Sequence, residues 1–396
     1  MREYIEYPIK SLSQQKARTF LTLLGIVIGI AVIVAMLSIG KGMDVSINQQ
    51  LEKMGADKIS IFPAGISFGP LGPSKEFVPF SLNELEEVRR ISGVESAVPY
   101  FMRAGTVEYR NEKKETTING GTRKGVDIFR KFYLLKEGRY FKDEESDAVN
   151  IGYRVSKDFF DNEVGVGDVL KIQGKKFKVV GVFEEIGNVG DDTAIYMPIK
   201  VAQKLFGAEN EITAIFAVAE NEEIVNKVAM KIEDLLEKIR GSKDFEIMTT
   251  EQMAEEIGNI TKIITFVLGG IASVSLVVGG VIIMNTMLVS VLERTREIGI
   301  MKATGATNSQ VLRLFLTESS LVGLSGGMLG IILGTLISKL IEVVGKSYIG
   351  GSFITVIDLR LVVGALLFSL AVGSISGVYP AWRASRLNPV DALRYE

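Results

Sequence analysis

The amino-acid sequence predicts an α-helical membrane protein with four transmembrane helices plus a large α+β extracytoplasmic domain between helices 1 and 2. Four long apolar segments carry almost no charge, and each is long enough to cross a bilayer. The polar residues 41–262 separate the first apolar segment from the other three. Basic residues gather on the short segments at one side of this pattern, which gives the chain a defined orientation.

The first apolar segment, residues 19–40, is charge-free and would span roughly 33 Å as a helix, enough for a hydrocarbon core of about 30 Å. A cleaved signal peptide needs an apolar region of only about 7–15 residues, so we assign a retained helix, TM1. Gly25 and Gly29 have the G-x-x-x-G spacing of close helix packing. Residues 1–18 mix apolar side chains at helical spacing with basic ones, which predicts a cytoplasmic amphipathic helix.

Three further apolar segments predict TM2 at 263–292, TM3 at 314–340 and TM4 at 359–382. TM2 is charge-free and longer than a bilayer requires. TM3 contains glycines at four-residue intervals, which we expect to let helices approach closely in lipid. These are Gly326, Gly330 and Gly334, with Gly323 and Gly327 on a neighbouring row. Small residues are also merely tolerated in some helices, and that alternative stays open.

The basic residues orient the four helices. The segment before TM1, the 293–313 loop and the tail 383–396 together hold 11 Lys and Arg, whereas the outer loop 341–358 and the helix ends beside it hold three. The positive-inside rule therefore places both termini and the 293–313 loop in the cytoplasm. Long loops cross largely regardless of charge, so residues 41–262 are expected outside. The prediction is a multi-pass protein of the cell (inner) membrane.

The pattern within residues 41–262 predicts an ordered domain and not a linker. Two β-α-β units at opposite ends of this segment indicate one discontinuous subdomain with an insertion between its halves. The insertion holds short alternating strands and glycine turn signals. The expected parts are stalk helices at 41–54 and 250–262, a split β-α-β subdomain at 57–100 and 211–249, and a β-rich insertion at 101–210.

Two helices of the split subdomain are predicted by different signals. Ser81 stands where it can cap a helix that runs through Ile91. The second helix, from Glu222 to Arg240, has a strong helical repeat of apolar residues. The face that we expect to be buried comprises Val225, Val228, Ile232, Leu235 and Ile239.

Composition and motifs exclude most catalytic chemistry. The sequence holds no Cys and no His, which removes thiol nucleophiles, imidazole bases and the usual zinc ligands. The only Gly-Lys-Ser, at 345–347, has Leu340 where a phosphate-binding loop needs its first glycine. We therefore predict no catalytic, cofactor or metal site in this chain. Adjacent acid pairs lack a nucleophile or base and are interpreted as surface charge: Glu144-Glu145, Glu184-Glu185 and Asp191-Asp192.

The charge distribution bounds the partners. Between Lys41 and Lys262 there are 31 Lys and Arg against 38 Asp and Glu, and the remainder carries 14 against 9. An acidic middle with basic, apolar ends argues against nucleic acid as a partner. The spans hold almost no ionisable residue, so the usual carriers of an ion-coupled pathway are missing. We expect the chain to take its energy from a partner.

The 293–313 loop predicts a small amphipathic helix between TM2 and TM3. Gly305 closes it, and Thr307 and Gln310 have capping-box spacing, so the next helix is expected to start at Thr307. A moving partner could bind such a helix. The alternative is a solvated turn whose arginines only set topology. The apolar patch of this helix comprises Ile298, Ile300 and Met301.

Three stretches resemble the MacB/FtsX-like permeases of ATP-binding-cassette (ABC) transporters. They are SLSQQKARTFLTLLGIVIGIAVIVAMLSIGKG at 11–42, ERTREIGIMKATGATNSQVLRLFLTESSLVGLSGGMLGIILG at 293–334 and GVYPAWRASRLNPVDALRYE at 377–396. The outer domain resembles that family only in size and split layout. The resemblance implies that the 293–313 loop forms a coupling helix seated on a separate ATPase. It implies coupling roles for Glu297, Ile298, Gly299, Met301, Lys302 and Gly305.

The resemblance further implies a permease subunit that is not an enzyme, with ATP and Mg held by the partner ATPase. It would couple hydrolysis to movement of the extracytoplasmic domain, and efflux of a drug, peptide or toxin is the expected function. Lipoprotein release, regulation of an outer partner and a receptor role stay open. The other expected partners are a second permease copy or a related permease, an extracytoplasmic adaptor and the lipid bilayer.

Overall fold

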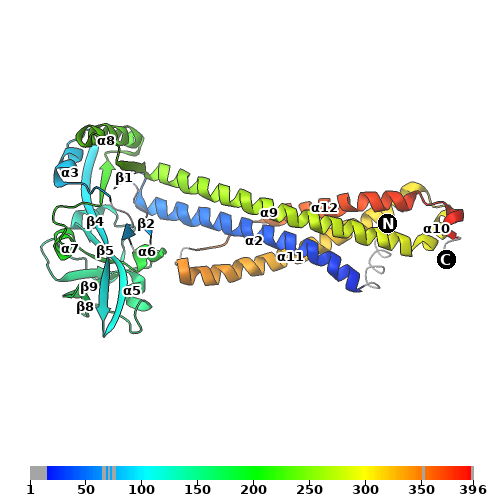
Figure 1. Ribbon diagram of the computed structural model, residues 1–396, viewed down its shortest axis with the longest axis horizontal. Helices are drawn as coiled ribbons and strands as arrows, with labels where there is room; N and C mark the ends of the chain where they lie inside the picture. Colours follow the sequence, from blue (N-terminus) through cyan, green and yellow to red (C-terminus); the bar gives the residue numbers. More distant parts are fainter. Residues whose placement is uncertain (1–15, 65–67, 70–71, 74–76, 350–352, 394–396) are drawn as a thin grey trace. The chain divides into compact units, whose positions relative to one another are not determined.

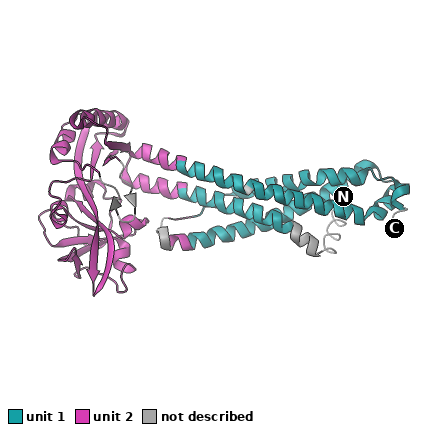
Figure 2. Cartoon of the chain, in the orientation of Figure 1, with its two compact units in different colours: residues 1–43, 260–343, 355–396 teal, residues 44–259, 344–354 magenta. Residues whose placement is uncertain are grey.

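The computed structural model describes residues 16–64, 68–69, 72–73, 77–349 and 353–393. The chain forms two compact units, which Figure 2 distinguishes by colour. Unit 1 comprises residues 1–43, 260–343 and 355–396, and unit 2 comprises residues 44–259 and 344–354. The helix predicted at 1–18 lies outside the described residues, apart from its last residues, which belong to a longer helix.

Unit 1 is built from long helices that pack side by side (Figure 1). They are α2 (Lys16–Met54), α9 (Thr250–Glu293), α11 (Asn308–Ile349) and α12 (Leu359–Ser385). Each is long and apolar enough to cross a membrane, which confirms the predicted spans as helices. Two short helices accompany them, α10 (Thr295–Ala303) and α13 (Pro389–Leu393).

The largest difference from the predicted membrane helices is at the end of TM3. TM3 was expected to end at Leu340, but α11 continues through Ile349, so the outer loop 341–358 is shorter than predicted. The added segment contains no proline, and Lys339 forms an ion pair with Glu342 at 2.7 Å along the continuing helix. Local helical interactions therefore persist beyond the apolar run that marked the span.

Unit 2 contains one large sheet with the strand order β12-β1-β11-β4-β5-β10-β7-β9-β6, and β8 pairs with both β4 and β9. The strands of this sheet are β1 (Lys58–Pro63), β4 (Val94–Tyr109), β5 (Glu112–Gly121), β6 (Leu135–Gly138), β7 (Ala148–Ile151), β8 (Val169–Ile172), β9 (Lys175–Phe183), β10 (Ile195–Pro198), β11 (Ala214–Ala219) and β12 (Phe245–Thr249). A separate two-stranded sheet pairs β2 (Phe68–Gly69) with β3 (Gly72–Pro73).

The split β-α-β layout is present in the sheet. Its helices are α3 (Leu82–Arg89) and α8 (Val225–Arg240). The halves β1-α3-β4 and β11-α8-β12 interleave, so that β11 lies between β1 and β4 with antiparallel pairing. Helix α3 covers Leu82–Arg89 and ends two residues before the predicted Ile91, whereas the predicted cap at Ser81 is confirmed. The Glu84 amide donates to Ser81 Oγ, and the Ser81 amide donates to the Glu84 carboxylate, which completes a capping box. Both helices share one buried apolar core with the strands.

Helix α8 covers Val225–Arg240 and follows a short 3₁₀ turn at Glu222–Ile224. The predicted buried face is wrong in the C-terminal half of this helix. Leu236 is buried there, whereas Ile239, which was expected to be buried, is 46% exposed. The buried positions follow a spacing of three or four residues from Val225 through Ile232 to Leu236, as a helix of 3.6 residues per turn requires.

The insertion is not separated from the split subdomain at residue 100. Strand β4 continues unbroken through that position to Tyr109, because its second half pairs with residues Glu112 to Gly120 of β5. The remaining strands of the insertion enclose a second apolar core. Short helices connect them: α4 (Arg123–Ile128), α5 (Tyr153–Lys157), α6 (Val189–Asp192) and α7 (Ile199–Phe206).

Candidate functional site

Helix α10 and its surroundings form the candidate site, and local signals define both of its ends. At its start, the Thr295 hydroxyl donates to the carbonyls of Val291 and Leu292 and so caps the end of α9. At its end, Gly305 adopts a left-handed backbone with φ of 103°. The Gln310 amide then donates to Thr307 Oγ1, which confirms the predicted start of α11.

One face of α10 is buried against the rest of unit 1. Ile298 is fully buried in the apolar core of the helices, and Met301 packs against that core. A Cβ on Gly299 would lie 2.8 Å from the Cβ of Ala392 on α13, so glycine permits this close approach. The expectation that Ile298 contacts a partner is therefore corrected, because its side chain is used inside this chain.

Lys302 also has an internal role. Its Nζ donates to the carbonyl of Ser385 at 2.9 Å and to that of Leu387 at 2.6 Å, just where α12 ends. A cation at this position satisfies free carbonyls and interacts favourably with the helix dipole. Lys302 therefore fastens α10 to the end of α12, and it does not stand free at the edge of a contact surface as the loop pattern suggested.

A buried ion pair joins the junction between α9 and α10 to α11. Arg294 Nη1 lies 3.2 Å from the Glu318 carboxylate, and the two side chains are only 11% and 4% exposed. Arg294 Nε also lies 3.2 Å from the carboxylate of Glu297 on α10. Sequence reasoning missed Glu318, although a lone acid inside a predicted apolar span was the signal that could have found it.

The opposite face of α10 is exposed. Ile300 is 49% exposed, and Arg296 and Glu297 beside it are exposed as well. Gly305, at the end of the helix, is also exposed, and nothing lies within 4 Å of the place where its Cβ would be. The site thus combines a rigidly attached helix with an outward apolar side chain flanked by opposite charges.

Comparison with known proteins assigns this architecture. A model of the MacB-like periplasmic core domain matches residues 19–235, more than half of the chain, and a model of the FtsX-like permease C-terminal region matches residues 269–389. An uncharacterized ABC transporter permease of Methanocaldococcus jannaschii is 36% identical over all of this chain and 98% of that protein. The chain belongs to the MacB/FtsX-like family of ABC transporter permeases.

Two further relatives of the permease are longer chains that are named as combined ATP-binding/permease proteins. The macrolide export ATP-binding/permease protein MacB of Bdellovibrio bacteriovorus is 32% identical over all of this chain and 62% of its own length. The pyoverdine export ATP-binding/permease protein PvdT of Pseudomonas aeruginosa is 33% identical over 95% of this chain and 56% of its own. The permease thus spans about three fifths of these relatives, and as an ABC transporter permease it works with an ATPase.

The glycines singled out from the sequence lie where helices of the permease meet. A Cβ on Gly25 would lie 3.3 Å from the Gly279 Cα of α9, and one on Gly29 would lie 3.2 Å from Leu276. The α11 row faces α2, with the closest contact of an added Cβ at 3.0 Å for Gly326, 2.7 Å for Gly330 and 2.6 Å for Gly334. These contacts are within one chain.

The second glycine row of α11 meets α12. A Cβ on Gly323 would lie 2.8 Å from the Cα of Gly373, and one on Gly327 would strike the Ser369 side chain. Helix α11 is therefore flanked by close backbone approaches on two sides. In the permease, van der Waals contact along these rows supplies the packing that apolar side chains cannot supply in lipid.

The pair Asp191-Asp192 was interpreted as surface charge, and that interpretation is wrong for Asp192. Asp192 is fully buried, and its carboxylate accepts from the amides of Ile186 at 2.8 Å and Gly187 at 2.9 Å. Burial raises the pKa of Asp192 from 3.8 to about 6, although the two amide donors oppose that rise. Within the described residues of the permease, no cluster of His, Cys, Asp and Glu could hold a metal ion.

Proposed function

We propose that this permease couples ATP hydrolysis on a partner ATPase subunit, which holds ATP and Mg, to movement of its extracytoplasmic domain. Both termini and α10 would face the cytoplasm of a cell (inner) membrane. The names of two relatives, which export a macrolide or pyoverdine, favour efflux of a drug, peptide or toxin. A second permease copy, or a related permease, and an extracytoplasmic adaptor belong to the same proposal.

The exposed face of α10 is the observation that carries this proposal. Ile300 presents about half of its side chain beside Arg296 and Glu297, while the buried face is fixed to the core of unit 1. An isolated solvated turn has no need of such anchoring. A partner that displaces this face would displace α10 as a whole, because Lys302 and Arg294 attach it to α12 and α11.

The long helices α2 and α9 would transmit a displacement of α10 to the extracytoplasmic domain. Helix α2 leads into β1, and β12 leads directly into α9, so each stalk helix is continuous with a strand of the split subdomain. Strands β1 and β12 pair with each other, and the Thr250 hydroxyl donates to the Gly55 carbonyl at 2.8 Å where the two connections meet. Movement of either helix would therefore be transmitted to paired backbone.

The contact is tested by placing a charge on the exposed face. Ile300→Asp should abolish co-purification of the ATPase and its stimulation by the permease, because an apolar contact would have to bury an unpaired carboxylate. Met230→Asp is the matched control, since Met230 is also an exposed apolar residue on a helix, 58% exposed on α8. Equal recovery and stimulation with wild type and Ile300→Asp would refute the proposed contact.

A further inference from the structure

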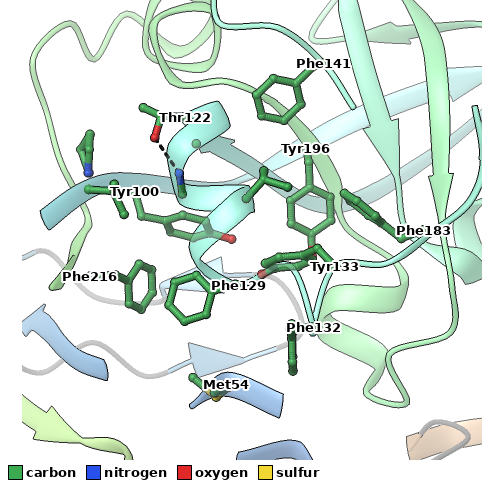
Figure 3. A pocket seen from close by; sticks show the side chains of 15 residues that line it. Met54, Tyr100, Thr122, Phe129, Phe132, Tyr133, Phe141, Phe183, Tyr196 and Phe216 are labelled. Carbon is green, nitrogen blue, oxygen red and sulfur yellow. Dashed lines mark hydrogen bonds between the residues drawn. The ribbon is translucent and has the colours of Figure 1, made fainter. Parts of the chain in front are cut away.

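An aromatic pocket in unit 2 has no role in the function described so far (Figure 3). It has a volume of about 80 Å³ and lies where the split subdomain, the insertion and the end of α2 meet. Phe216 comes from β11, Phe183 and Tyr196 come from the insertion, and Met54 is the last residue of α2. The pocket thus connects three parts of unit 2.

The aromatic side chains hold one another in place around this pocket. The Phe183 and Tyr196 rings lie 5.0 Å apart in an edge-to-face arrangement, and Phe129 and Phe216 lie 5.3 Å apart in the same way. Tyr133 lies 5.3 Å from Tyr196. Such contacts are individually favourable and fix the ring orientations. The walls are therefore preorganised.

A carboxylate behind the wall gives the pocket a negative character: Asp191 does not line the pocket but contacts Tyr196, which does. The Tyr196 hydroxyl donates to Asp191 Oδ1 at 2.7 Å, and the Asn188 side-chain amide donates to Asp191 Oδ2 at 2.9 Å. Both of these partners are neutral, so they do not cancel the charge of the carboxylate. Figure 3 shows the hydroxyls of Tyr100 and Tyr133 turned toward each other in the same space.

The pKa values of three tyrosine hydroxyls at the pocket reflect the same negative charge. Burial, followed by the negative charge of Asp191, raises the pKa of the Tyr100, Tyr133 and Tyr196 hydroxyls well above their usual range. Among the residues that the structure describes, no Lys or Arg lines the pocket. Aromatic rings with a nearby carboxylate attract a cation, above all one whose alkyl groups can also use apolar walls.

We propose that this pocket binds the trialkylammonium group of an organic cation. Its volume of about 80 Å³ restricts an occupant to a compact head group, because sites for whole drug-sized molecules measure about 300–1,000 Å³. Because Met54 lines the pocket, an occupant would contact the end of a stalk helix. The proposal stands on the outer domain alone and does not depend on coupling to an ATPase.

The test compares choline with its neutral isostere 3,3-dimethylbutan-1-ol on the full-length protein. The protein is placed in nanodiscs of phosphatidylethanolamine and phosphatidylglycerol, because phosphatidylcholine would itself supply the head group. Binding is followed by saturation-transfer NMR and calorimetry. Choline should bind at least about tenfold more tightly than the isostere, since only the cation gains the electrostatic attraction.

Variants locate the binding in the pocket. Asp191→Asn should reduce choline affinity about tenfold and leave the isostere unaffected. Asp158→Asn is the charge-matched control, because Asp158 lies exposed on the insertion and pairs with Arg154. Absence of choline binding, equal affinity for both probes, or unchanged choline affinity in correctly folded Asp191→Asn would each overturn the proposal. The two-probe comparison on wild type stands even where that variant does not fold.

Discussion

The buried ion pair between Arg294 and Glu318 makes a quantitative prediction about unit 1. Its side chains are 11% and 4% exposed, so removing Glu318 leaves the Arg294 guanidinium poorly solvated, with the more exposed Glu297 carboxylate still at 3.2 Å. Breaking a buried pair in this way costs about 3–5 kcal/mol, whereas replacing both charges by apolar groups is often nearly neutral. Glu318→Leu should therefore destabilise unit 1 by about 3–5 kcal/mol. Arg294→Met with Glu318→Leu should restore most of that loss.

The assay is a double-mutant cycle on detergent-solubilised protein. Trp382 is the single tryptophan of the sequence and lies on α12, so its fluorescence follows unfolding of unit 1. The two single variants and the double variant are compared with wild type, and the coupling energy is the departure from additivity. Additive losses, with the double variant least stable of the four, would refute the account of this pair.

Three further predictions test packing, orientation and protonation. Gly330→Ala should destabilise unit 1 by about 1–3 kcal/mol in thermal unfolding, because the added methyl would lie 2.7 Å from a neighbouring helix; Gly270→Ala, which meets nothing within 4 Å, should be neutral or stabilising. A membrane-impermeant maleimide on intact cells should label Glu144→Cys and miss Asn308→Cys, and the reverse would overturn the orientation. Because the folded pKa of Asp192, about 6, is above its ordinary value of 3.8, its contribution to stability is present below about pH 4 and is lost as the pH rises to about 6. Urea unfolding of the outer domain should show that decline, on the order of 3 kcal/mol, in wild type and not in Asp192→Asn.

Local signals predicted much of this fold. Charge-free runs locate the spans because a long apolar run has few other uses. The cap at Ser81 and the capping-box spacing at Thr307 mark helix starts, since their hydrogen bonds depend only on neighbouring residues. Two β-α-β units at opposite ends of the segment predicted one discontinuous subdomain, and the structure adds that their strands interleave around a shared core.

The orientation of α10 could not be predicted in the same way. Its nine residues place apolar side chains on more than one side, and burial of Ile298 instead of Ile300 depends on its packing in unit 1. Helix α13, from the tail, covers Gly299. Asn388 and Pro389 have the cap and first-turn preferences of a helix start, which was the signal for this element.

Side-chain contacts with residues far away in the chain could not be predicted from the sequence either. Lys302 is charged and lies in a polar loop, so its pattern indicates a solvated rim, yet its partners are carbonyls more than eighty positions away in the chain. Asp192 sits in an acidic pair, and only the folded turn at Ile186 and Gly187 provides the donors that hold it inside.

The central claim is that the exposed face of α10 contacts an ATPase. The sequence contains no cysteine, so a single cysteine at Ile300 can be coupled to a short photo-crosslinker without background. We predict that it forms an adduct with the partner ATPase in membranes and that a cysteine at Met230 forms none. Adducts from both positions, or from neither while transport remains intact, would contradict the claim.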